Sequence, residues 1–250
     1  MPEGMISYAQ DAEDVILNRA FSRQRTGFYI DVGAWDPDFD SVTKHFYLNG
    51  WRGINIEPTD LYHARLMERR PADINLKVAV GPTGGRAQFL QHGDSGLSGL
   101  VDTTERLASF NAISDFDTKQ IEVEVMPLSE ITSRYAAPTV DFLKIDVEGG
   151  ERGVIESAEW RAFRPRVVIV ESIKPLTNEP SWFNWEGLLF DAGYCFALFD
   201  GLNRYYYRAE EPALRLDLST PANVLDAYVT ASFKSLQDRI HELESRLVRS

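Results

Sequence analysis

The chain has 250 residues, of which 26 are Lys or Arg and 38 are Asp or Glu, so its formal net charge is −12 at pH 7. Such an acidic chain lacks the cationic surface that general nucleic-acid binding requires, and we expect no nucleic-acid partner. Its hydrophobic content of 44% is that of a globular protein, and the length allows a sizeable buried core.

The sequence also lacks the patterns of exported and membrane proteins. Its first residues include Glu3, Asp11 and Glu13 and no apolar stretch typical of a signal peptide. No apolar run approaches the roughly 20 residues that a membrane-spanning helix needs. The single cysteine, Cys195, excludes an internal disulfide and a cysteine-rich zinc site. We therefore expect a cytoplasmic protein without a membrane span.

Short apolar runs alternate with helical patterns along most of the chain. The runs are rich in β-branched or aromatic residues and are too short for helices. They lie at 28–30, 54–56, 76–80, 142–145, 167–170 and 195–199. The helical patterns lie between them, at about 41–50, 59–69, 150–162 and 181–192. This alternation predicts an α/β fold with a mostly parallel sheet covered by helices on both faces.

The end of this region has a different pattern. Asp200-Gly201 separates the run at 195–199 from the strand-like residues 204–207, which is typical of a hairpin. The last strand is therefore expected to run antiparallel to its neighbour. Between 85 and 125 the pattern is less regular, with strand candidates at 86–90 and 121–125 and a glycine-rich loop at 93–99.

The C-terminal segment carries a heptad pattern. Its apolar residues are spaced by alternating steps of four and three, at Val229, Phe233, Leu236, Ile240, Leu243 and Leu247. The alternative is an amphipathic helix that packs on its own domain. The strict spacing favours self-association, so we expect one domain over 1–225, a coiled-coil helix over 226–250, and a homo-oligomer. The coil would also suit a larger parent polypeptide.

Acidic residues follow five of the strand candidates, at Asp31, Glu57, Asp146, Glu171 and Asp200. In an open α/β sheet, ligands bind beyond the carboxyl ends of the strands. The first four acids are therefore expected to converge on one crevice. The alternative interpretation is that they are ordinary helix caps and turn residues.

The first two strand ends favour a particular kind of ligand. Gly33 would allow a ligand to approach the backbone, and a carboxylate such as Glu57 can accept hydrogen bonds from both hydroxyls of a ribose. The turn at 31–36 lacks the glycine pattern that cradles a pyrophosphate, and it carries two acids that would repel phosphates. A ribose-bearing cofactor with positive charge and no phosphate fits S-adenosylmethionine.

The chain resembles the FkbM-type S-adenosylmethionine-dependent methyltransferases. The matching segments are Ser7-Tyr8-Ala9-Gln10 with Glu13-Asp14, Phe28 to Ala34, Gly53 to Pro58, Val78 to Gly81, and Asp141 to Gly149. The set is ordered, and the resemblance spans about residues 6–210. Trp35-Asp36-Pro37 departs from the small and polar residues that are more common at that turn.

The resemblance implies a Rossmann-like, seven-stranded methyltransferase sheet with a reversed last strand. It also implies O-methylation, often of sugars in polysaccharides or secondary metabolites, so the expected partner is a glycan or glycan-linked acceptor. For the cofactor, it implies that Asp31, Gly33 and Ala34 hold the methionine end, Glu57 with Pro58 the ribose, and Ala79 the adenine edge. Gln10 and its neighbours would close over the cofactor, and Asp146 would lie beside it.

Methylation of a sugar hydroxyl requires a group that removes the hydroxyl proton or lowers its pKa. Asp146, Glu148 and Glu171 are the best candidates for a general base by position, although Glu148 would also suit the capped start of a helix. Asp146 and Glu171 on adjacent strand ends could instead hold a divalent metal such as Mg²⁺.

Two other classes of function stay open. A different nucleotide-binding enzyme, such as a short dehydrogenase, is disfavoured by the missing glycine pattern. A catalytically idle scaffold that acts through its coiled coil is disfavoured by the intact acids Asp31, Glu57 and Asp146.

Overall fold

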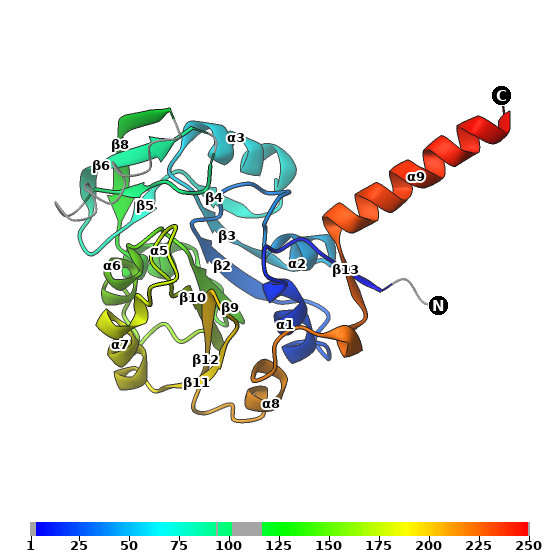
Figure 1. Cartoon of the computed structure of the whole chain (residues 1–250). Helices are drawn as coiled ribbons and strands as arrows, with labels where there is room; N and C mark the ends of the chain where they lie inside the picture. The colour runs from blue at the N-terminus through cyan, green and yellow to red at the C-terminus, as the bar shows by residue number, and fades with distance from the viewer. Residues whose placement is uncertain (1–3, 94, 102–116, 250) are drawn as a thin grey trace.

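The computed structural model describes residues 4–93, 95–101 and 117–249. A central sheet of seven strands has helices on both faces, and one long helix extends from this body (Figure 1). Across the sheet the strands are β11 (Tyr194–Phe199), β12 (Asn203–Arg208), β10 (Val167–Glu171), β9 (Phe142–Ile145), β2 (Phe28–Val32), β3 (Arg52–Ile56) and β4 (Ile74–Leu76).

The sheet is parallel except at one strand. The neighbouring pairs β10–β9, β9–β2, β2–β3 and β3–β4 are all parallel. Strand β12 pairs antiparallel with both β10 and β11. The hairpin expected around Asp200-Gly201 is therefore present, since β11 and β12 are joined there. The carboxyl ends of β3, β2, β9 and β10 consequently meet at one edge of the sheet.

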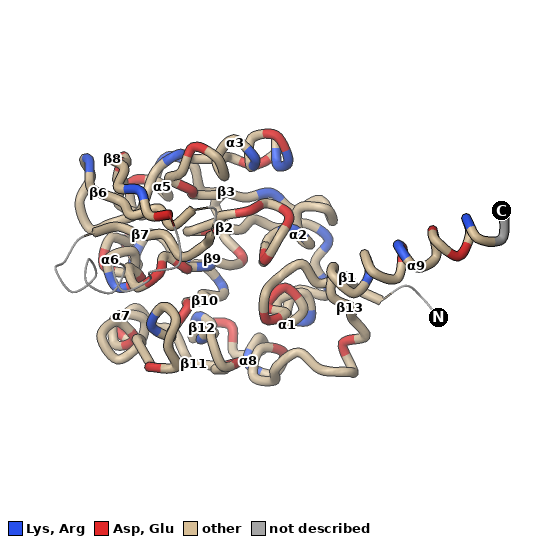
Figure 2. The backbone as a smooth tube through the Cα atoms, turned by 45° about the horizontal axis from the view of Figure 1, so that its top comes forward, with Lys and Arg blue, Asp and Glu red and all other residues tan. Residues whose placement is uncertain are grey.

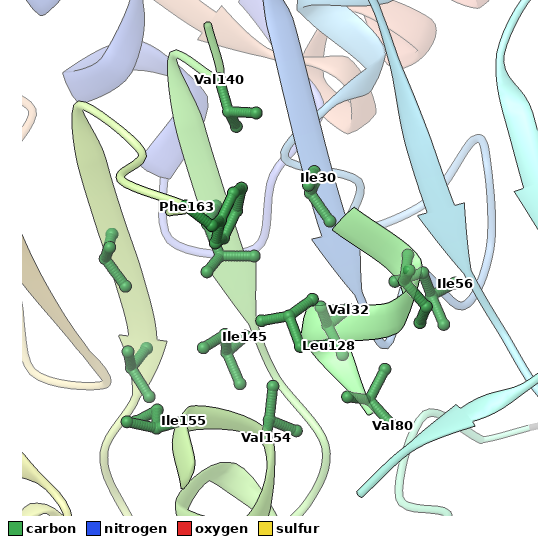
Figure 3. Packing of buried hydrophobic residues seen from close by; sticks show 14 of the residues in the cluster. Ile30, Val32, Ile56, Val80, Leu128, Val140, Ile145, Val154, Ile155 and Phe163 are labelled. Atoms are coloured by element: carbon green, nitrogen blue, oxygen red, sulfur yellow. The ribbon is translucent and has the colours of Figure 1, made fainter. Parts of the chain in front are cut away.

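Alternating side chains of the strands supply two separate cores. Ile30 and Val32 of β2 face one side, where they pack with residues of α5 (Leu128–Tyr135) and α6 (Glu151–Glu156), as Figure 3 shows. Tyr29 of β2 and Phe142 of β9 face the other side, where they pack near α1 (Glu13–Ala20) and α2 (Lys44–Leu48). A strand buried on both faces reads as a continuous apolar run, which explains why these strands were predictable.

Further helices lie in the described part of the chain. They are α3 (Asp60–Arg69), η1 (Trp182–Asn184), α7 (Glu186–Asp191), α8 (Leu214–Leu218) and η2 (Val224–Asp226). The pattern at 181–192 therefore contains two short helices rather than one, and the pattern at 150–162 contains a helix of only six residues.

Residues 79–126 include a second sheet that the sequence did not predict as a unit. Its strands, in order, are β5 (Ala79–Val80), β8 (Thr118–Met126), β6 (Gly85–His92) and β7 (Gly99–Leu100). The apolar run at 76–80 is thus divided, because β4 ends at Leu76 in the large sheet and β5 starts at Ala79 in the small one. Part of the glycine-rich loop at 93–99, Asp94, lies outside the described residues.

The first and the last strand of the described chain lie side by side. Strand β1 (Met5–Ser7) pairs in parallel with β13 (Tyr228–Thr230), and helix α9 (Ala231–Arg249) follows β13 directly. Figure 1 shows α9 pointing away from the sheets and the other helices. Among the described residues, no helix combines the length and the apolar character needed to cross a bilayer.

Candidate active site

A cavity of about 370 Å³ opens at the carboxyl ends of β3, β2, β9 and β10. Three of the four strand-end acids that were expected to converge, Glu57, Asp146 and Glu171, line this cavity. It is also lined by the other residues proposed from sequence for the cofactor or the chemistry, which are Gln10, Gly33, Ala34, Pro58, Ala79 and Glu148. Asp31, the fourth acid, is not among the lining residues. The positions of the acids in the sequence thus indicated where the cavity lies, but Asp31 does not line it.

The turn after β2 is held against two neighbouring strands. Gly33 has φ +82°, and a Cβ atom at this position would lie 1.7 Å from the carbonyl oxygen of Asp146. The amide groups of Gly33 and Ala34 donate to the carbonyl of Ile56, at 3.0 and 3.1 Å. Glycine is therefore required here by the close approach of the chain after β9. The close approach to Gly33 is thus made by the protein's own backbone, whereas the sequence alone suggested the approach of a ligand.

Glu57, directly after β3, is buried and preorganised. Its Oε1 accepts hydrogen bonds from the amide and the hydroxyl of Thr59, at 2.8 and 2.5 Å, and its Oε2 accepts from the amide of Trp35 at 3.3 Å. Burial raises the pKa of Glu57, and the hydrogen bonds from Thr59 oppose this effect. A carboxylate has about four acceptor sites, so Oε2 retains capacity for a ligand hydroxyl.

An aromatic wall lies next to Glu57. The rings of Trp35 and Tyr62 have centroids 5.3 Å apart, and both residues line the cavity. Trp35 has φ +44°, a left-handed conformation that is rare for a large side chain and that turns this residue into the cavity wall. Within the described part of the chain, its buried indole N–H has no hydrogen-bond partner. This wall therefore offers an aromatic surface and one unused donor to a ligand.

Asp31 is buried on the face of the sheet that packs against α1 and α2, beneath the cavity. It lies directly opposite Lys144 in the parallel pair β2–β9. The Lys144 ammonium is 3.6 Å from Oδ1 of Asp31, and Oδ2 of Asp31 accepts a hydrogen bond from the hydroxyl of Thr43 at 3.0 Å. The structure thus places Asp31 against Lys144 rather than at the cavity surface, where the resemblance had implied a cofactor contact.

Lys144 connects this buried acid to the cavity. Its Nζ atom is 3.2 Å from Oδ2 of Asp146 and 3.5 Å from the carbonyl of Gly33. Burial lowers the pKa of Lys144, but the carboxylates of Asp146 and Asp31 outweigh burial and raise the pKa above its ordinary value. Lys144 is therefore a fixed cation that holds Asp146 in place, and it is unsuited to act as a base.

Glu171, at the end of β10, has a different environment from Glu57. Its Oε2 is buried and has no hydrogen-bond partner among the described residues. Burial raises the pKa of Glu171 well above its ordinary value, and the neighbouring acids Asp146, Glu148 and Glu151 raise it further. A carboxyl group with a raised pKa is a stronger base than an ordinary glutamate, which suits it to accept a proton.

Asp146, Glu148 and Glu171 form one cluster. Each offers a carboxylate oxygen, and these oxygens lie within 4.8 Å of one another. Carboxylates are the ligands that Mg²⁺ prefers, so the chemistry of the donors suits such an ion. The Lys144 ammonium beside Asp146 already supplies one positive charge to the cluster and would repel a second cation. Glu148 itself has φ +55° and lies in the loop before α6.

The segment before α1 forms the entrance to the cavity. Gln10 lines the cavity, and the residues on either side of it are anchored. Asp14 accepts hydrogen bonds from the Ser7 hydroxyl at 2.6 Å and from the Tyr8 amide at 2.8 Å. Glu13 accepts from the Asp11 amide at 2.8 Å and from the side chain of Asn203 on β12 at 3.0 Å. These acids therefore fix the loop that carries Gln10.

Two features of the site were missed by sequence reasoning. Lys144 stands in an apolar run that was read only as a strand, and its partner Asp31 was read as a ligand contact. A lysine inside a buried strand requires a buried acid nearby, and that rule was the available signal. Tyr62 was not identified because nothing in the sequence shows that α3 lies against the turn at Trp35.

Comparisons with known proteins identify the family of the chain. The family described as "Methyltransferase FkbM domain" matches residues 31–196, which is about two thirds of the chain. The chain therefore belongs to the FkbM methyltransferase family, as the sequence motifs indicated. No curated protein sequence matches it.

Two solved structures have a low similarity to the chain. A precorrin-6y C5,15-methyltransferase from Geobacter metallireducens is 13% identical, with 75% of this chain and 72% of that chain covered and a TM-score of 0.39. An O-methyltransferase from Bacillus cereus in complex with SAH is 12% identical, with 80% and 82% covered and a TM-score of 0.39.

Proposed function

We propose that this member of the FkbM methyltransferase family transfers a methyl group from S-adenosylmethionine to a hydroxyl oxygen. The observation that carries the proposal is the pair of glutamates at the two ends of one cavity. Glu57 is an ionisable group already surrounded by donors, whereas Glu171 is a buried carboxyl with a raised pKa and an unused oxygen. The first suits ligand binding, and the second suits proton transfer.

The order of the strands supports the placement of the cofactor. Glu57 follows β3, Gly33 lies after β2, Asp146 follows β9 and Glu171 follows β10, so these residues succeed one another across the sheet. Three strand spacings separate Glu57 from Glu171, which is roughly 14 Å. We assign the ribose to Glu57, the adenine to the side of Trp35, Tyr62 and Ala79, and the methionine part to the turn at Gly33 and Ala34.

The bound cofactor supplies an electrophilic methyl group on a positively charged sulfur. In the proposed step, Glu171 accepts the proton of the acceptor hydroxyl while the oxygen–methyl bond forms and the sulfur–methyl bond breaks, which leaves S-adenosylhomocysteine and a protonated Glu171. Lys144 keeps Asp146 oriented toward the cavity, and Asp31 acts through Lys144 as a positioning residue. Gln10 and residues 95–100 border the opening and would limit the access of water.

A second mechanism uses a metal in place of the base. Asp146, Glu148 and Glu171 would hold a divalent ion such as Mg²⁺, which would lower the pKa of the hydroxyl. The mutual distances of the three carboxylates favour this alternative, and the ammonium of Lys144 opposes it. A chelator distinguishes the two, because only the metal-dependent reaction stops in its presence.

We infer that the acceptor is a sugar hydroxyl in a glycan or glycan-linked molecule. The inference rests on the family resemblance together with the acids Asp40, Asp146, Glu148 and Glu171 on the acceptor side of the cavity. These acids would repel a phosphate or carboxylate next to the reacting hydroxyl, so the methylated residue is expected to be uncharged.

The experiment is a transfer assay with S-adenosylmethionine labelled in its methyl group. Neutral, uronic and phosphorylated glycans would be offered with and without chelator. We expect label in the neutral glycans and unchanged transfer in chelator. A folded protein that binds NAD but not S-adenosylhomocysteine would indicate a different nucleotide-binding enzyme. Cofactor binding without transfer to any acceptor would favour a scaffold.

A further inference from the structure

Helix α9 presents an apolar face that the rest of the described chain leaves exposed. Phe233, Leu236, Ile240 and Leu243 are 52, 64, 56 and 45% exposed. They occupy one side of a helix that points away from the body of the protein (Figure 1). A row of large apolar side chains on an isolated helix is typical of a surface that is covered by a partner.

The start of α9 is anchored to the rest of the protein through the strand and the turn that precede it. Strand β13, directly before the helix, pairs with β1 over Tyr228 to Thr230. The preceding turn is held by Asp226, whose carboxylate caps the Asn223 amide at 2.8 Å and pairs with Arg19 of α1 at 2.9 Å. The free-standing part of the chain therefore begins at Ala231, a few residues after the boundary expected from sequence.

The spacing of the apolar residues defines heptad positions. Phe233 and Ile240 occupy positions a, and Leu236 and Leu243 occupy positions d, since the steps alternate between three and four. Ile240 is a β-branched residue at a, which together with leucine at d favours two-stranded parallel coils, whereas Phe233 is not β-branched, so the orientation depends on the flanking charges. The flanking positions then follow: Arg239 is at g and Glu244 is at e.

These flanking charges select the orientation of a partner helix. In a parallel, in-register pair, a residue at g faces the residue five positions later on the other helix, so Arg239 of each chain meets Glu244 of the other. In an antiparallel pair, positions g face each other, and Arg239 would approach a second Arg239. Opposite charges thus meet only in the parallel arrangement.

The charges also argue against a lipid surface as the partner. Helix α9 carries interspersed basic and acidic side chains, and Figure 2 shows both signs along it. They include Lys234, Asp238, Arg239, Glu242, Glu244 and Arg246. An interfacial helix on anionic lipid carries mainly Lys and Arg on its polar face. A second copy of the same chain satisfies both the apolar face and the mixed charges.

We propose that α9 forms a parallel, in-register, two-stranded coiled coil with a second copy of this chain. The proposal does not depend on the reaction catalysed. Because β13 fixes the helix start beside β1, the two catalytic domains lie at the same end of the coil. Helix α9 contains 19 residues, so the coil is short and its dimer is expected to dissociate on dilution.

The first test is the mass in solution as a function of concentration, measured by sedimentation equilibrium. The wild-type chain is expected to approach twice 28.3 kDa as concentration rises. Ile240→Asp places a charge in the seam and is expected to remain at the monomer mass. Ser235→Asp adds the same charge to the same helix outside the seam and is expected to dimerise as the wild type does. Circular dichroism checks that both variants are folded.

The second test determines the orientation by disulfide formation. Leu236→Cys and Leu243→Cys are made separately, and the wild-type chain, whose one cysteine is Cys195, gives the background. A parallel, in-register dimer predicts that each variant forms a covalent dimer with itself under mild oxidation. Absence of self-cross-linking in both variants, at concentrations at which they dimerise, would exclude a parallel, in-register pair and overturn the proposal. A monomer at all concentrations, or binding only to phosphatidylglycerol vesicles, would also overturn it.

Discussion

Glu57 and Glu171 follow parallel strands of the same sheet and line the same cavity, yet their surroundings are opposite. Glu57 receives three hydrogen bonds from its own chain, so its carboxylate is oriented before any ligand arrives. Glu171 faces other acids and has a buried oxygen without a partner in the described part of the protein. The role of an acid at a strand end thus depends on its neighbours. Hydrogen-bond donors around it keep it oriented for ligand binding, whereas other acids around it raise its pKa and suit it to accept a proton.

The largest expected effect comes from removing the proposed base. Glu171→Gln keeps the shape of the side chain but cannot accept the hydroxyl proton, and general-base contributions are typically about 10²- to 10⁴-fold. We expect methyl transfer to fall by that factor while affinity for S-adenosylhomocysteine stays within a few-fold of wild type. Single-turnover transfer and calorimetry measure the two. Equal losses in the transfer rate and in cofactor affinity would show that Glu171 binds the cofactor as Glu57 does, and would contradict its role as the base.

The same assignment predicts a pH dependence. The reaction needs ionised Glu171, and the raised pKa of this group means that the ionised fraction increases only as the pH approaches that raised value. We expect kcat/KM to rise with pH below the raised pKa and to level off above it. The residual activity of Glu171→Gln should lack this rise. A wild-type profile that stays flat over the whole pH range in which the protein remains folded would contradict the assignment.

The next prediction concerns the contribution of Lys144 to the stability of the folded chain. Lys144→Met leaves the buried Asp31 without its charge partner, and breaking a buried pair in this way costs about 3–5 kcal/mol. We expect denaturant unfolding to show this loss, and Asp31→Asn in the same chain to recover part of it. Additive losses in the double variant would show that the two residues do not act together.

A smaller effect concerns stability and pH at the entrance to the cavity. Burial raises the pKa of Glu13 to about 7, so the folded chain binds this proton more tightly than the unfolded chain. The contribution of Glu13 to the free energy of unfolding is fully present below the unfolded pKa of 4.5 and is lost as the pH rises through about 7. At about 1.4 kcal/mol per pKa unit, the loss amounts to up to about 3 kcal/mol.

Denaturant unfolding of the wild type, measured from pH 4.5 to 8, should therefore show a free energy of unfolding that declines with pH. Other buried acids also contribute to this decline. The decline should be shallower for Glu13→Gln. An unchanged slope in this variant would mean that Glu13 titrates normally in the folded chain.

The smallest expected effect is at the preorganised glutamate. Glu57→Gln removes the charge that would accept the ribose hydroxyls, and a hydrogen bond to a charged group contributes about 1.5–3 kcal/mol. We expect the Kd for S-adenosylhomocysteine to rise by about 10- to 100-fold on this basis. Glu68→Gln makes the same change at an exposed position of α3 and should bind as the wild type does.

Much of this arrangement could be predicted because buried parallel strands leave a strong signal. The runs at 28–30, 54–56, 142–145 and 167–170 are mostly apolar and buried, with Asn55 and Lys144 as exceptions in composition, and the acids that follow the runs marked the cavity edge. The lysine inside the buried run at 142–145 indicated that a buried acid lies nearby, but it did not identify Asp31 as that acid, because this depends on the pairing of β2 with β9. The strands at 86–90 and 121–125 were predicted and are present as β6 and β8, but their pairing into a separate small sheet was missed, because it joins segments that are distant in the sequence.

The different roles of the two glutamates are tested most directly by a calorimetric titration of S-adenosylhomocysteine into the wild type, Glu57→Gln and Glu171→Gln. We expect one site per chain in the wild type, weakened binding in Glu57→Gln and nearly unchanged binding in Glu171→Gln. Absence of binding to the folded wild type, or equal weakening in both variants, would contradict these roles.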